Sequence, residues 1–235
     1  MIARIATLVA KTQLTRGRLI GLLGIGSLTV LFGLAIGFGE SFRQTSETLD
    51  MTQGYGLQVV APAVALILAS AALGDFVDDR TLVYMWLRPV PRWQIAAGAA
   101  LASVGTALPL VAIPLTLGAY LGSADATIAA GAAAASLVAT LGYAGVFLAL
   151  GFKVRRALVW GLAYILIWEG FLANSVSFAA KLSIGIYARS LLQHIAGGEL
   201  PNHGSTVTAA VIWPVIAAVV AVAVTARWLH TTEVA

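Results

Sequence analysis

The chain has 235 residues, of which 60% are hydrophobic and only 10% are charged, and its formal net charge is +4. Soluble globular domains carry about 25% charged residues, so this composition excludes the water-soluble enzyme classes and favours a membrane protein. Because the sequence contains no cysteine, it also excludes disulfides, thiolate metal sites, iron–sulfur clusters and a cysteine nucleophile.

Six apolar stretches predict an all-α polytopic membrane protein, since about 20 helical residues cross a hydrocarbon core of about 30 Å. The expected spans are residues 19–38, 57–73, 95–121, 127–150, 157–178 and 207–228. The second span is the shortest. We expect it to continue past Gly74 as a helix, because no helix breaker lies between Asp75 and Tyr84.

The distribution of Lys and Arg predicts the orientation of the spans, because cytoplasmic loops are enriched in both residues. One side of the predicted topology holds Arg4, Lys11, Arg16, Arg18, Arg80, Arg88, Arg92, Lys153, Arg155, Arg156 and Arg227. The other side holds only Arg43, Lys181 and Arg189. Both termini should therefore be cytoplasmic. A signal peptide is the alternative for the first apolar run, but this run is long and five more spans follow it.

Polar and apolar residues near the N-terminus fall on two different helical faces, at spacings of three and four residues. The polar face comprises Arg4, Thr7, Lys11, Thr15 and Arg18, and the apolar face comprises Ile2, Ile5, Ala6 and Val9. This pattern predicts an interfacial helix over residues 1–18, with its basic face against anionic headgroups. An irregular start to the first span is the alternative.

Residues 74–93, between spans two and three, predict a short cytoplasmic helix. Its aspartates share one helical face: Asp75, Asp78 and Asp79. Asp79 or Thr81 is suited to cap the helix, and Pro89 and Pro91 end it, because proline lacks the amide donor. Its apolar residues are Leu82, Val83, Met85, Trp86 and Leu87. So much apolar surface next to charges predicts a protein partner. The alternative is packing against the chain's own helices or on the headgroups.

The stretch from 172 to 206 is too long for a simple turn on the outer face. Residues 183–196 predict an amphipathic helix with Arg189 and Gln193 on a polar face, and two glycines at 197 and 198 would end it. We expect re-entrant outer helices between spans five and six. An ordinary extracellular loop is the alternative.

Two local patterns narrow the class of membrane protein. The first is the acidic, Thr-Leu, Arg-Pro-x-x-Arg run at residues 78–82 and 88–92, and the second is Trp-Glu-Gly-Phe-Leu at residues 168–172 in span five. With these patterns and six spans, nearly the whole chain resembles a permease subunit of the type-2 ATP-binding-cassette (ABC) exporter family. In that family the first pattern follows span two and contains a coupling helix, and re-entrant outer helices follow span five.

The resemblance implies a dimer of six-helix permeases in a bacterial cell membrane, with an identical or homologous second permease and a separate ATPase subunit for each. The implied ATPase-coupling residues are Asp78, Asp79, Thr81, Leu82, Met85, Trp86, Arg88 and Arg92. ATP and Mg are expected on the partner ATPase. The chain has no Gly-Lys dipeptide and hence no Walker A loop, so we expect it not to be an enzyme and to bind no cofactor, metal or nucleic acid. Its cargo would be an unidentified substrate, and the apolar faces of the spans are compatible with a hydrophobic one.

On this interpretation residues 1–235 form one transmembrane domain. Its expected parts are an interfacial helix (1–18), spans one and two (19–73), a cytoplasmic coupling segment (74–93), spans three to five (95–178), an outer helical segment (179–206), and span six with the tail (207–235).

Glu169 is the only acidic residue deep in an expected span. An unpaired charge at that depth costs at least about 2.5–3.5 kcal/mol, so Glu169 should face protein or water, or be protonated. It is a candidate for the transport pathway and for binding a cationic substrate group. It is equally a candidate for fastening span five to the outer helices through Asn174, Ser175 or backbone amides.

Two other functions stay open. A non-transporting scaffold or sensor would keep the same helical frame. A magnesium-dependent membrane lipid transferase would use a pair of aspartate-rich motifs to clamp a diphosphate through magnesium, and only the cluster at residues 75–79 is present. Separately, Gly33 and Gly37 form a Gly-x-x-x-Gly face suited to close helix contact, either within one chain or between two.

Overall fold

The computed structural model describes residues 2–39, 43–78, 91–200 and 204–231. Within these ranges the chain is helical and has no strand, and six helical stretches are long and apolar enough to cross a membrane. These stretches are Arg16–Gly37, Gln44–Val77, Arg92–Ser123, Ala126–Lys153, Ala157–Ser175 and Val207–Thr231. The predicted all-α fold with six candidate spans is confirmed.

The helices that the structure describes follow one another along the chain. In order they are α1 (Ile2–Gln13), α2 (Arg16–Gly37), α3 (Gln44–Asp50), the π-helix η1 (Met51–Val60), α4 (Ala61–Asp78), α6 (Arg92–Ser123), α7 (Ala126–Lys153), α8 (Ala157–Ala163), the π-helix η2 (Tyr164–Leu172), α9 (Ala173–Ser175), α10 (Ser177–Ala180), α11 (Ile184–Ala196) and α12 (Val207–Thr231).

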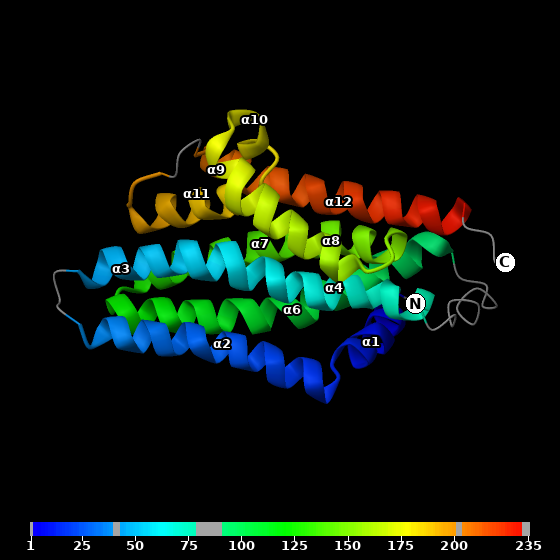
Figure 1. Cartoon of the computed structure of the whole chain (residues 1–235), viewed down its shortest axis with the longest axis horizontal. Helices are drawn as coiled ribbons and strands as arrows, with labels where there is room; N and C mark the ends of the chain where they lie inside the picture. The colour runs from blue at the N-terminus through cyan, green and yellow to red at the C-terminus, as the bar shows by residue number, and fades with distance from the viewer. Residues whose placement is uncertain (1, 40–42, 79–90, 201–203, 232–235) are drawn as a thin grey trace.

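The long helices run side by side and form a bundle (Figure 1). Helix α7 is central, because it packs against α4, α6, α11 and α12. The start of α1 and the end of α12 lie at one end of the bundle, which we call the terminal end, together with the end of α4, the start of α6 and the turn from α7 to α8 (Figure 1). The opposite, distal end carries the turn from α6 to α7.

Two of the helical stretches have bounds that differ from the expected spans. The second span does not begin at Leu57, because α3 and η1 continue it back to Gln44. The polar residues between 44 and 56 lower the local hydropathy, so the hydropathy pattern does not predict this part of the helix. Thr48 and Thr52 in it are nevertheless buried. The fifth span ends at Ser175 rather than at 178, because Val176 adopts an extended conformation. The expected continuation of span two past Gly74 is present up to Asp78.

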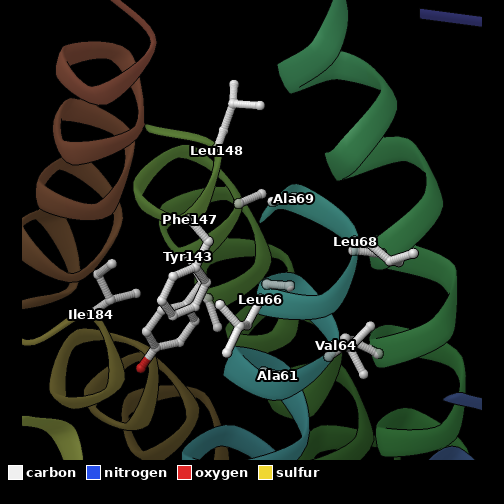
Figure 2. Close-up of a cluster of buried hydrophobic side chains, with 14 of the residues drawn as sticks. Ala61, Val64, Leu66, Leu68, Ala69, Tyr143, Phe147, Leu148 and Ile184 are labelled. Carbon is white, nitrogen blue, oxygen red and sulfur yellow. The ribbon is translucent and has the colours of Figure 1, made fainter. Parts of the chain in front are cut away.

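Close backbone contacts explain two of the glycines of α2. A Cβ on Gly33 would collide with the backbone of Gly118 in α6, and a Cβ on Gly37 would collide with the carbonyl oxygen of Leu121. The Gly-x-x-x-Gly face is therefore used inside the chain. Larger buried side chains of α4 and α7, among them Leu66, Tyr143 and Phe147, belong to one hydrophobic cluster (Figure 2).

Helix α1 is attached to the bundle by a buried amide. Gln13 Nε2 donates hydrogen bonds to the carbonyl oxygen of Leu68 and to Ser103 Oγ, both at 3.0 Å, and its Oε1 accepts one from Thr106 Oγ1 at 3.0 Å. Arg4 and Lys11 are exposed, as expected for an interfacial helix. However, the helix ends at Gln13 and α2 begins at Arg16, so residues 2–18 do not form one continuous helix.

Candidate functional site

Most of the predicted coupling residues lie outside the described part of the chain: Asp79, Thr81, Leu82, Met85, Trp86 and Arg88. The structure describes the two flanks of this segment. Helix α4 leads into it and ends at Asp78, and α6 leaves it and begins at Arg92. Each flank is tied to another helix at the terminal end.

An ion pair joins the first flank to α2. Arg18 Nη1 lies 2.8 Å from Asp75 Oδ2, and Arg18 Nη2 lies 3.2 Å from Asp75 Oδ1. This two-bond geometry is the strong and directional form of an arginine–carboxylate contact. The side chains are 32% and 39% exposed, so the pair links α2 to α4 but contributes little to the stability of the fold.

A main-chain contact joins the second flank to α12. The last carbonyl groups of a helix have no partner within the helix and accept bonds from basic side chains. Arg92 Nη1 donates to the carbonyl oxygens of Leu229 and His230, in the last turn of α12. Arg92, for which the family resemblance implies a coupling role, thus links the start of α6 to the end of α12.

The second site surrounds Glu169 in η2, whose side chain is only 1% exposed. Its Oε1 accepts hydrogen bonds from the Ile184 amide at 3.1 Å and from the Tyr164 hydroxyl at 3.2 Å. Its Oε2 accepts bonds from Ser183 Oγ and from the Gly185 amide, the latter at 3.3 Å. The carboxylate is therefore fully occupied by donors from its own chain.

The N-terminus of α11 supplies most of these donors. Ser183 is the N-cap and accepts a bond from the Ile186 amide at 3.1 Å. The first amides of α11, at Ile184 and Gly185, are left for the Glu169 carboxylate, which is also favoured by the positive end of the helix dipole. A Cβ on Gly185 would lie 2.8 Å from Glu169 Oε2, so glycine allows the carboxylate to approach.

Asn174 and Arg189 form a second layer around this contact. Asn174 Nδ2 donates to the carbonyl oxygens of Glu169 at 3.2 Å and Gly170 at 2.9 Å. Arg189 Nη2 donates to Asn174 Oδ1 at 3.1 Å, and its Nε donates to the carbonyl oxygen of Gly185 at 3.3 Å. Arg189 therefore bridges α11 to the end of span five.

The predicted amphipathic helix at residues 183–196 is present as α11. The predicted end of the helix is also confirmed, because Gly197 is its C-cap and has φ +72°. Gln193 does not lie on an exposed polar face as predicted. It is only 5% exposed, because α11 packs on α7 and α12. Gly131 of α7 makes room for this packing, since a Cβ there would touch Leu192.

Sequence reasoning missed Tyr143. Its hydroxyl is buried and lies beside the Glu169 carboxylate, next to Gly185. Its ring stacks on Phe147 at 5.8 Å. A single tyrosine in the middle of an Ala- and Gly-rich span was the available signal.

Among the described residues, no group of three or more His, Cys, Asp or Glu side chains is placed to hold a metal ion. His194 is exposed, and its Nδ1 lies 2.8 Å from the carbonyl oxygen of Ser190. No protein-family model and no curated protein matches the chain. The functional assignment therefore depends on the sequence patterns and on the geometry of these two sites.

Proposed function

We propose that the chain is the transmembrane permease subunit of an ABC exporter, with residues 74–93 docked on a separate ATPase subunit. The observation that carries this proposal is the attachment of both flanks of that segment. Asp75 joins α4 to α2, and Arg92 joins α6 to α12. A segment held in this way passes an applied displacement to four of the six candidate spans.

Energy enters this mechanism from outside the chain. The partner binds ATP and Mg, and its closure moves the docked segment. The ion pair between Arg18 and Asp75 and the contact between Arg92 and α12 carry this movement into the bundle. The apolar residues expected in the docked helix, including Met85 and Trp86, supply contact area worth about 1.5–3 kcal/mol for each buried side chain.

In the other half of the proposed permease, the Glu169 contact joins several helices into one unit. It ties the end of span five to α11, and α11 packs on α7 and α12. We place α11 in the outer leaflet as a re-entrant helix, because it lies between α10 and the distal end (Figure 1). In this arrangement Glu169 positions the outer helices rather than contacting the cargo.

A second permease subunit, identical or homologous, completes the proposed exporter. The candidate spans with the least buried surface are Arg16–Gly37, Ala157–Ser175 and Val207–Thr231. Their exposed apolar side chains suit contact with lipid or with the partner permease. Both termini and the docked segment are cytoplasmic in this proposal.

Copurification tests the proposal. The tagged chain is extracted in a mild detergent, and its bound subunits are identified. We expect an ATP-binding-cassette ATPase with the parent chain and with Trp86→Phe, which keeps an apolar ring. Trp86→Asp should release the ATPase. Partners that bind without nucleotide-coupled transport would instead identify a scaffold, and full transport by Trp86→Asp would contradict the coupling role.

A further inference from the structure

A cavity of about 220 Å³ lies at the terminal end, between α4 and the turn from α7 to α8. Its charged lining residues are Arg18, Asp75, Lys153, Arg155 and Arg156. The ion pair with Asp75 neutralises Arg18. Among the residues whose side chains the structure describes, no ion pair joins a carboxylate to the other three basic side chains. The cavity therefore carries an excess of positive charge.

The backbone of the turn places two arginines in succession at this cavity. Val154 is extended, and Arg156 adopts a left-handed conformation with φ +62°. Non-glycine residues rarely adopt positive φ, and such positions often belong to functional sites. Lys153 lies beside them, with Nζ 5.6 Å from the centre of the Trp228 ring. The ring face attracts the cation, and Trp is enriched at the level where spans meet the headgroups.

Apart from Ser70 the uncharged lining residues are apolar, and those from α4 follow one face of that helix. They include Ile67, Ala71 and Gly74 from α4 and Leu158 from α8. Ile67 and Asp75 are eight residues apart, which is about 12 Å of helix. Along the direction of the spans, the lining thus changes from apolar to charged over about 12 Å. In a lipid, the chemistry changes in the same order from acyl chain to headgroup.

We infer that this cavity binds the headgroup of an anionic phospholipid. Its phosphate lies against Arg155 and Arg156, because the guanidinium fork matches phosphate oxygens. Its first acyl carbons lie on the apolar floor, which a soluble anion would not use. The volume is below the roughly 300–1,000 Å³ of a complete small-molecule site, so the acyl tails remain outside.

The adjoining surface has room for these tails. Leu158 is 53% exposed and Trp160 is 62% exposed. Both follow the arginine turn directly in α8. A lipid in this position contacts α4 and α8 together and stabilises their packing. The inference does not depend on the exporter assignment, because it needs neither an ATPase nor a cargo.

Lipid retention by the purified full chain tests the inference. The chain is extracted in a neutral detergent, exposed to equal amounts of phosphatidylglycerol and phosphatidylcholine, and examined by native mass spectrometry. We expect one phosphatidylglycerol to be retained preferentially. The double variant Arg155→Gln and Arg156→Gln should lower this retention at least about tenfold.

A matched control separates the cavity from general electrostatic attraction. Arg16 and Arg227 are exposed basic residues at the same end and do not line the cavity. Changing both to Gln removes the same charge, and we expect phosphatidylglycerol to be retained. Equal losses in the two double variants would overturn the inference.

A second variant separates a lipid from a soluble phosphate. Ala71→Leu fills the apolar floor and leaves every charge in place, so it should abolish lipid retention. Millimolar inorganic phosphate should not displace the bound lipid from the parent chain. Retention by folded Ala71→Leu, or displacement by phosphate, would show a soluble-anion site and overturn the lipid assignment. Tryptophan fluorescence and elution volume verify that each variant is folded.

Discussion

Ser183 donates its hydroxyl to the carboxylate of Glu169 while the same oxygen caps the amide of Ile186. Each of the two side chains thus fixes the other, and together they satisfy the first amides of α11. A buried charge in an apolar span is expensive unless it is paired and hydrogen-bonded. In this chain four donors occupy the carboxylate, and three of them come from residues 183–185 at the start of α11.

Glu169→Gln should destabilise the docking of α11. An amide offers one acceptor oxygen where the carboxylate offers two, so its NH₂ group would face a main-chain amide donor at the start of α11. Leaving one buried donor unpaired costs about 1–3 kcal/mol. We expect a lower unfolding temperature in detergent and faster proteolysis near residues 176–200.

Glu199→Gln is the matched control for this variant, because Glu199 is exposed in the same outer segment. An exposed substitution away from special contacts changes stability by about 0.5 kcal/mol or less. If Glu169→Gln is as stable as this control but transport is lost, Glu169 acts in the pathway and not as a fastener of α11.

Sequence periodicity predicts the elements of this fold better than it predicts their partners. The span count and the stop of α11 at Gly197 follow from hydropathy and from local capping rules. The start of span two does not, because burial of Thr48 depends on neighbouring helices. The partner of Glu169 lies 14 to 16 residues away, and Arg92 meets α12 across 137 residues. Such contacts follow from helix packing, which no local pattern encodes.

Gly33→Ala should destabilise the contact of α2 with α6. The added Cβ would collide with the backbone of Gly118, which cannot move aside as a side chain can. Overpacking of this kind costs about 1–3 kcal/mol. Thermal unfolding in detergent measures the loss.

Gly24→Ala provides the opposite expectation in the same helix. Nothing lies within 4 Å of a Cβ placed on Gly24, and alanine is favoured over glycine in a helix by about 0.8–1.0 kcal/mol. We expect unchanged or higher stability. An equal loss in both variants would mean that α2 does not pack on α6 through Gly33.

Exchanging the charges of Arg18 and Asp75 should preserve the link between α2 and α4. Arg18→Asp alone, or Asp75→Arg alone, places like charges together, and each should lower the free energy of unfolding. The double exchange restores attraction. It also puts an acid in the first turn of α2, where the helix dipole favours negative charge.

Because the pair is partly exposed, the coupling energy should be about 0.2–1 kcal/mol. A double-mutant cycle on thermal unfolding measures this coupling, and additive effects would show that the ion pair does not hold the helices.

Cysteine labelling tests the orientation, and the chain suits it because it contains no native cysteine. Ala3 in α1 and Thr231 at the end of α12 are exposed at the terminal end, and Ala126 at the start of α7 is exposed at the distal end. Single cysteines at these positions are treated with a membrane-impermeant maleimide in intact cells. We expect Ala126→Cys to be labelled, and Ala3→Cys and Thr231→Cys to react only after lysis.

The reverse pattern would place residues 74–93 outside the cell, away from ATP, and would exclude the proposed coupling. Different behaviour of Ala3→Cys and Thr231→Cys would contradict the bundle itself, because both belong to the same end.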